Sequence, residues 1–202
     1  MILTYEKGRA DKIHISVDGV YTMTVDATYW YGLGIKNKTE ICEEELVQLK
    51  SRINSRRAFN KAIDLISRRE HSRKEIITKL KQRDYGDVAE SVADELERLG
   101  YLNDERFARM YANELKERKK FGKRRIIQEL YIKGIDRDII EAVTEETEEA
   151  PEEAIAEIIN KKYRNCLEDQ KGLNRAINGL VRLGYNFSDI KKVISEIDNF
   201  KH

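Results

Sequence analysis

An apolar pattern that returns every fifty residues constrains this chain more than any other feature. Ser72, Gly122 and Gly172 stand at equal intervals, and each precedes an apolar pair at helical spacing. The pairs are Ile77 and Leu80, Ile127 and Leu130, and Ile177 and Leu180. The positions that follow keep step at fifty-one residues (Val88, Ile139 and Ile190; Val92, Val143 and Ile194), and Ala58 and Ala62 recur as Ala108 and Ala112. Self-similarity at a fixed period predicts tandem units, here three units of three helices.

The predicted fold is mainly α: three tandem three-helix repeats in an elongated array, preceded by a small N-terminal region of β-hairpin and helix. We place the N-terminal extension at residues 1–54 and the repeats at residues 55–102, 103–149 and 150–202. A composition with 37% charged residues, 11 glycines and one proline suits short helices. A unit of about 45 residues has a marginal core by itself, so neighbouring repeats are expected to stack.

Local signals set the ends of the predicted helices. Ser72 and Glu75 form a capping box, in which the serine oxygen accepts an early backbone N–H and the glutamate reaches back to the cap. Asp87 is expected to cap the next helix and Gly100 to end it, and Asn103 or Asp104 to cap the one after. RLGYLND (98–104) and RLGYNFSD (182–189) lie outside the fifty-residue register. We therefore interpret them as two uses of the same local signal, which ends one helix and begins the next, and not as copies of a repeated unit.

The first fifty residues have the alternation of strands. Ile13 and Ile15 alternate with polar residues before the turn, as do Tyr21, Met23 and Val25 after it. A two-residue Asp-Gly turn would pair Val17 with Val20 and place the two apolar sets on opposite faces. A three-residue loop, Val17-Asp18-Gly19, pairs Ile15 with Tyr21 and Ile13 with Met23, and we prefer it. A short helix stopped by Gly32 and Gly34 and a second helix beginning at EEELVQLKSRI are expected to follow.

Several classes of protein find no support in the sequence. No apolar run approaches the length of a membrane span and no secretory signal begins the chain, so we expect a cytoplasmic protein. Cys42 and Cys166 have no paired spacing and are interpreted as packing residues, while the three histidines, His14, His71 and His202, share no motif. We expect no metal, no cofactor and no enzymatic activity, because no nucleophile–base pair and no phosphate-binding glycine loop is present.

Charge is strongly segregated along the chain despite a net charge of +1. The stretch 116–125 holds seven basic residues against Glu117 alone: Lys116, Arg118, Lys119, Lys120, Lys123, Arg124 and Arg125. These residues span a helix end, the Phe121-Gly122 break and the next helix start, where cations oppose the helix dipole. The stretch is either a binding surface for a polyanion or a solvated face. A second, weaker candidate comprises Arg56, Arg57, Arg68, Arg69, Arg73 and Lys74.

An acidic segment lies between the second and third repeats. Residues 138–157 hold nine carboxylates and no basic residue, and Pro151 lies among them. Proline is well tolerated in a first helical turn, and we expect a hinge at this position.

Two strings carry a resemblance to a known family. LGYLNDERFA (99–108), followed by GKRRIIQELYIKGI (122–135), resembles the signature of the RecX regulators of the bacterial RecA recombinase. The tandem three-helix units and the upstream hairpin VDGVYTMTV are similar to members with an extended N-terminus. In the third repeat mainly LNRAINGLVRLGY keeps the pattern.

The resemblance implies a non-enzymatic modulator in recombination and DNA repair. Such a protein, expected to be a monomer, would lie in the helical groove of the RecA filament on single-stranded DNA and limit filament extension, ATP hydrolysis and strand exchange. Within the signature, apolar and turn residues are expected to serve the junction between repeats: Leu99, Gly100, Tyr101, Leu102, Phe107 and Ala108. Tyr111 and Tyr131 would either stack on bases or pack in the core, and we prefer the core.

Two other functions stay open. One is a DNA-binding architectural or regulatory protein that acts without RecA. The other is a scaffold whose acidic segment recruits a basic partner. Dependence of binding on salt and on the cations of residues 116–125 separates the two.

Overall fold

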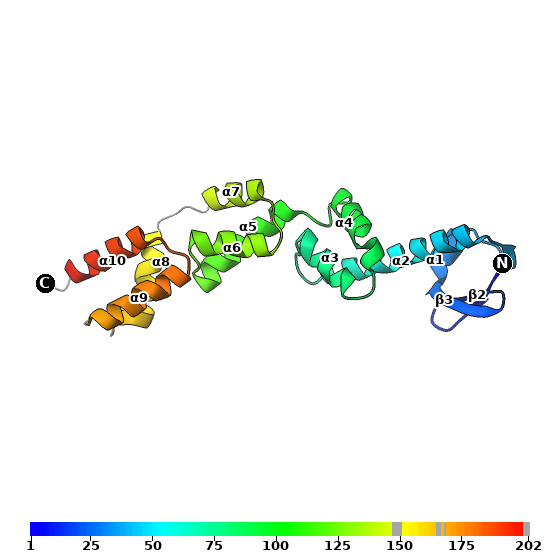
Figure 1. Cartoon of the computed structure of the whole chain (residues 1–202), viewed down its shortest axis with the longest axis horizontal. Coiled ribbons are helices and arrows are strands. Elements are labelled where there is room, and N and C mark those ends of the chain that lie inside the picture. The colour runs from blue at the N-terminus through cyan, green and yellow to red at the C-terminus, as the bar shows by residue number, and fades with distance from the viewer. Residues whose placement is uncertain (147–150, 165–166, 168, 200–202) are drawn as a thin grey trace. The chain divides into compact units, whose positions relative to one another are not determined.

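The structure, a computed structural model, describes residues 1–146, 151–164, 167 and 169–199. A small sheet and a short helix come first, and the rest of the described chain is helical (Figure 1). Two compact units are distinguished, residues 1–63 with 80–92 and residues 64–79 with 93–202, and each is described separately. Residues 147–150, Cys166 and His202 lie outside the described part, whereas Pro151, where a hinge is predicted, is described.

The N-terminal sheet has four antiparallel strands in the order β3-β2-β1-β4. Their bounds are β1 Ile2–Lys7, β2 Lys12–Val17, β3 Val20–Asp26 and β4 Thr39–Glu40. The preferred three-residue loop is wrong: Val17 pairs with Val20 across a two-residue Asp18-Gly19 turn, whose residues both have positive φ. A shift of register at Ile15/Ser16 then pairs Ile15 with Met23. This bulge places Ile13, Ile15, Met23 and Val25 on one face, which the tight turn alone would not do, whereas Tyr21 pairs with Ser16 and is 61% exposed.

Helices α1 (Ala27–Gly32) and α2 (Glu43–Ile66) form after the hairpin, as predicted, and the short strand β4, which was not predicted, lies between them. Trp30 of α1 and Leu49 and Ile53 of α2 join the strand residues in one buried core. Cys42 is exposed and does not pack: it caps α2, with its Sγ accepting the Glu45 N–H (3.4 Å) and its own N–H donating to the Glu45 carboxylate (2.9 Å). Helix α2 is continuous through residues 54 and 55, where the sequence placed a domain boundary.

The next helices are α3 (Arg73–Lys81) and α4 (Ala89–Arg98), with a 3₁₀ turn, η1 (Gly86–Val88), between them. Val88, Val92 and Leu96 are buried in one stripe, as predicted. Asp87 is not a cap but lies inside the 3₁₀ turn, because the chain already turns at Tyr85. Gly100 ends α4 with φ +75°, the left-handed conformation expected of a C-terminal glycine.

Three helices form the second repeat: α5 (Asp104–Lys119), α6 (Lys123–Ile132) and α7 (Arg137–Glu146). Asn103 caps α5 by accepting the Arg106 N–H at 2.7 Å. The core contains the predicted repeat positions Ala108, Ala112, Leu130 and Val143. Leu102, Phe107 and Ala108 are buried as expected, whereas Leu99 and Tyr101 are about half exposed.

The third repeat begins with Pro151 at the first position of α8 (Pro151–Ile158), which continues into a π-helical turn, η2 (Ile159–Tyr163). Helices α9 (Gln170–Arg182) and α10 (Phe187–Asn199) complete it. Leu180, Ile190 and Ile194 of the predicted pattern are buried in one core. The two RLGY strings end different helices, α4 and α9, so their interpretation as one local solution is confirmed.

The start of a repeat's second helix docks on the end of the second helix in the next repeat. The Ser72 hydroxyl donates to the Lys133 carbonyl at 2.8 Å. Fifty residues further along, the Gly122 N–H donates to the Leu183 carbonyl, also at 2.8 Å, and the Arg124 N–H donates to the Gly184 carbonyl at 3.3 Å. The first junction therefore uses side chains where the second uses the backbone.

The backbone junction requires glycine at both sides. A Cβ on Gly122 would lie 2.6 Å from the Gly184 carbonyl group, and one on Gly184, where φ is +96°, would lie 2.4 Å from the Arg125 nitrogen. In contrast, a Cβ on Gly86 would meet nothing closer than 4.0 Å.

We predict that Gly122→Ala lowers the free energy of unfolding by about 1–3 kcal/mol, because backbone atoms must move to admit the methyl group. The measurement is urea denaturation followed by circular dichroism. Gly86→Ala is the matched control and should change stability by less than about 1 kcal/mol. Equal stability of the two variants would show that the close approach is not needed.

Candidate partner-binding surface

The predicted basic stretch forms the corner between α5 and α6. Helix α5 ends at Lys119, and Lys120 adopts the left-handed conformation at φ 52°, with its N–H bonded to the Lys116 carbonyl. The Phe121 N–H returns to the Leu115 carbonyl at 3.1 Å, which closes the helix end. Gly122 then precedes α6, so the basic side chains leave from both sides of a tight turn.

Part of this stretch is engaged within the protein. Arg118 pairs with Glu114 (3.4 Å), Lys120 with Glu157 of α8 (3.2 Å), and Arg125 with Glu129 (2.6 Å). The Arg125 guanidinium and the Lys119 ammonium also lie over the Phe121 ring, at 5.6 and 5.8 Å from its centre. These contacts hold the corner together, and they lower the positive charge available to a partner.

The side chains of Lys119, Lys123 and Arg124 are exposed, as is that of Arg118. In the described part of the chain no carboxylate pairs with Arg124. Lys123 and Arg124 occupy the first turn of α6, where positive charge is unfavourable to the helix by about 0.3–1 kcal/mol each.

A hollow of about 790 Å³ lies beside the corner, against the third repeat. Its lining includes both basic residues (Lys116, Lys120 and Lys123) and acidic residues (Glu153, Glu157 and Asp189). The buried Tyr185 hydroxyl donates to the Lys120 carbonyl at 3.0 Å, and burial, aided by Glu157, raises the pKa of Tyr185 to about 12. The phenol therefore stays a hydrogen-bond donor across the physiological range of pH.

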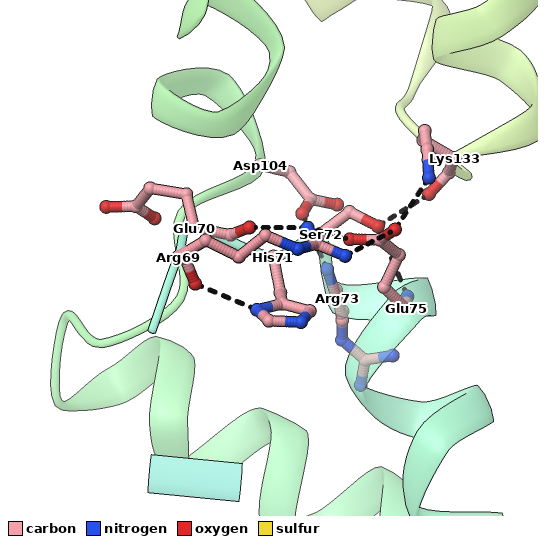
Figure 2. Close-up of polar contacts among 8 residues, drawn as sticks. All are labelled: Arg69, Glu70, His71, Ser72, Arg73, Glu75, Asp104 and Lys133. Carbon is pink, nitrogen blue, oxygen red and sulfur yellow. Dashed lines mark hydrogen bonds and ion pairs between the residues drawn. The ribbon is translucent and has the colours of Figure 1, made fainter. Parts of the chain in front are cut away.

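Three of the six residues of the second basic group lie at the first junction, and Figure 2 shows two of them, Arg69 and Arg73. Arg69 bonds the Glu75 carboxylate at 3.0 Å, Arg73 pairs with Glu97 (3.2 Å) and with Asp94, and Lys74 donates to the Ile132 carbonyl (3.1 Å). Arg68 makes an exposed pair with Asp64. These roles within the chain support a structural interpretation of Arg69, Arg73 and Lys74.

Glu75 is at the centre of that junction. Its backbone N–H bonds the Ser72 hydroxyl at 3.2 Å, as the capping box predicts, but its carboxylate turns away from the cap to Arg69 and to Lys133 (2.6 Å). Burial alone would raise the pKa of Glu75, but the hydrogen bonds from Arg69 and Lys133 outweigh it and lower the pKa to about 2. Neighbouring Asp104 accepts the Arg73 N–H at 2.8 Å, and burial raises its pKa.

Tyr111 and Tyr131 differ in their environment. Tyr111 is half-buried and stacks on Phe107, with 5.5 Å between ring centres. Tyr131 is 49% exposed, so the prediction that it lies in the core is wrong. It occupies the outward side of α6, a distinction that helical spacing left open.

The described residues contain neither a membrane-spanning helix nor a candidate metal cluster. None of their helices has the length and apolar character to cross a membrane. Residues 1–146, 151–164, 167 and 169–199 contain no cluster of three or more His, Cys, Asp or Glu side chains that would hold a metal ion.

We predict that Glu75→Gln lowers the free energy of unfolding at pH 7 by about 1.5–3 kcal/mol, because it removes a charge that two cations bond. A carboxyl with a lowered pKa in the folded state contributes its stability above the unfolded pKa of about 4.3, and the contribution is lost as the pH falls toward 2. The difference between the variant and the wild type should therefore shrink between pH 5 and pH 2 in urea denaturation.

Glu141→Gln is the matched control, since Glu141 pairs with Arg137 on an exposed surface. This substitution should lower the free energy of unfolding by less than about 0.5 kcal/mol. A difference for Glu75→Gln that does not depend on pH would contradict the role of its charge.

Comparisons with known proteins agree with this architecture. Family profiles of the first and second three-helix domains of RecX match residues 58–96 and 103–143. The regulatory protein RecX of Caldanaerobacter subterraneus is 32% identical over 94% of this chain and 95% of its own length, and that of Clostridioides difficile is 31% identical over 96% and 93%.

Solved structures show the same fold. A crystal structure of regulatory protein RecX has a TM-score of 0.74 at 20% identity, and covers 95% of this chain and 97% of its own. RecX from Lactobacillus salivarius has a TM-score of 0.63 at 23% identity over 72% of this chain and 97% of its own. With its sequence matched over nearly the full length, this chain belongs to the RecX family of regulatory proteins.

Proposed function

We propose that this protein is a non-enzymatic regulator that binds the RecA filament on single-stranded DNA in the cytoplasm. It lies as a monomer in the helical groove of the filament and limits filament extension, ATP hydrolysis and strand exchange. Membership of the RecX family supports this proposal. The observation that carries it to particular residues is the set of exposed cations, Lys119, Lys123 and Arg124, at the corner of the second three-helix domain.

The geometry of the corner suits a polyanionic or acidic surface. Tandem three-helix domains present such corners at intervals along the chain, and cations on a tight turn reach several phosphates or carboxylates together. In the proposed division of roles, Lys119, Lys123 and Arg124 contact the filament. Lys120 and Arg125 hold the corner through Glu157 and Glu129.

The test is ATP hydrolysis by RecA on an excess of single-stranded DNA, with this protein at substoichiometric amounts. A marked fall in the rate is expected, because competition for DNA cannot produce it at those ratios. An unchanged rate together with tight binding to bare DNA would replace the proposal by a DNA-binding protein that acts without RecA.

We predict that Lys123→Glu with Arg124→Glu raises the concentration needed for half of this effect about thirtyfold, since two contacts of about 1 kcal/mol each are lost. Acidic residues in the first turn of α6 favour the helix, so the fold should persist and circular dichroism should be unchanged. Lys171→Glu with Arg175→Glu makes the same change of charge at exposed positions of α9 and is the control. Equal effects of both pairs would remove the corner from the proposed surface.

A further inference from the structure

The middle of α2 carries positive charge that the protein itself does not neutralise. Residues 50–61, KSRINSRRAFNK, include five basic residues and no acidic one. Lys50, Arg52, Arg56 and Arg57 are exposed, and in the described chain none of these four pairs with a carboxylate. At the α5–α6 corner, by comparison, Arg118, Lys120 and Arg125 each have an acidic partner. The α2 segment is thus the less compensated cationic surface.

Two of these cations, Arg56 and Arg57, line a groove between α2, β3 and α1. The Arg57 guanidinium donates to the Thr24 carbonyl of β3, which orients it at the sheet edge. The Arg56 guanidinium lies near two rings, 5.7 Å from the centre of Tyr29 and 5.9 Å from that of Phe59. Two hollows of about 320 and 240 Å³ share Asp26, Tyr29, Arg56 and Asn60 as lining residues. The groove is therefore bounded by oriented guanidiniums and an aromatic side chain.

Hydrogen bonds and an ion pair within the protein hold Tyr29 and Asp26 in place in the groove. The Tyr29 hydroxyl donates to the Arg52 carbonyl at 3.3 Å, which links its ring to α2. Asp26, the single acidic residue that lines the hollows, accepts the Tyr29 N–H at 3.2 Å and lies 3.8 Å from the Lys12 ammonium. Its charge is thereby offset, and the groove keeps a positive balance.

We propose that this groove is a second nucleic-acid site, which binds a single strand through its phosphates and stacks a base at Arg56 and Tyr29. Arg52, Arg56 and Arg57 contact the phosphodiester backbone, since guanidinium groups match phosphate oxygens in charge and geometry. A base enters the hollow, where planar guanidinium and aromatic groups offer stacking and the Asn60 amide offers a hydrogen bond. An acidic polypeptide would use the cations alone and leave the aromatic and amide groups without a role.

The site lies in the N-terminal unit and is separate from the corner of Lys123 and Arg124. It does not depend on RecA. Bare single-stranded DNA is therefore the probe that tests it, and filament inhibition tests the other proposal.

The experiment measures binding of the full chain to a fluorescein-labelled 20-nucleotide oligo(dT) by fluorescence anisotropy at several KCl concentrations. Arg52→Gln with Arg56→Gln should weaken binding at least tenfold at low salt. It should also reduce the slope of log K against log [KCl] by about 1.4, the value for two lost phosphate contacts on a single strand. Arg57 is left in place because it contacts β3, and circular dichroism checks the fold.

Lys171→Gln with Arg175→Gln gives the same loss of charge on α9 and should leave the affinity and the slope within twofold of the wild type. If both pairs weaken binding equally, net charge alone explains the binding and the site is refuted. Arg56→Lys keeps the charge but loses the planar group, so it should keep the slope and weaken binding about threefold to tenfold. Full affinity in Arg56→Lys would refute the stacking role.

A 20-residue polyglutamate distinguishes the alternative occupant. It should bind at least tenfold more weakly than oligo(dT). The Arg56→Lys substitution should also weaken its binding less than it weakens the binding of oligo(dT). Binding of polyglutamate as tight as that of oligo(dT), with the same loss in Arg52→Gln/Arg56→Gln, would overturn the proposal in favour of an acidic protein partner.

Discussion

The contact between successive three-helix domains is the constraint on which the rest of the helical part depends. In both junctions the N-terminus of a second helix meets the carbonyl groups at the C-terminus of the next second helix, at the same register. A left-handed residue ends that helix each time, Gly134 at φ 80° and Gly184 at φ 96°. The left-handed turn exposes carbonyls that would otherwise be unpaired, and the neighbouring domain satisfies them. Stacking thus supplies hydrogen bonds as well as buried area.

The two junctions satisfy the carbonyl groups at the helix end with different donors, and this difference determines which cations stay at the surface. Backbone groups of Gly122 and Gly184 meet directly, so that junction leaves the cations of the α5–α6 corner mostly at the surface. The first junction lacks the glycine on one side and uses Ser72, Lys133 and the Glu75 carboxylate instead. The cations at that junction form ion pairs and hydrogen bonds within the protein. Two basic segments of similar composition therefore have different availability to a partner.

Predictions from the sequence are correct where a single local signal determines the structure. They are wrong where a residue has a choice between a local partner and a distant one, or where an irregularity changes the strand pairing. The repeat positions, Gly100 as a helix end and Asn103 as a cap all follow from spacing and turn chemistry. The hairpin was wrong because a bulge at Ile15/Ser16, which no residue type announces, restores the apolar face after a tight turn. Glu75 left its expected partner because Lys133, 58 residues away, offers a charged hydrogen bond in a buried place. Cys42 was assigned to packing because a thiol cap is an uncommon use of cysteine.

The sequence by itself determined the helical class, the three repeats and the family signature. Each of these depends only on the spacing of apolar residues and on turn residues that are a few positions apart in the chain. Which cations face outward was decided only by the tertiary structure. Charge segregation marked both basic groups alike, but an ion pair depends on residues that are distant in the chain, such as Lys120 with Glu157 or Arg106 with Glu70. The unpaired charge on α2 and the groove beside it likewise exist only once β3 and α1 pack against that helix.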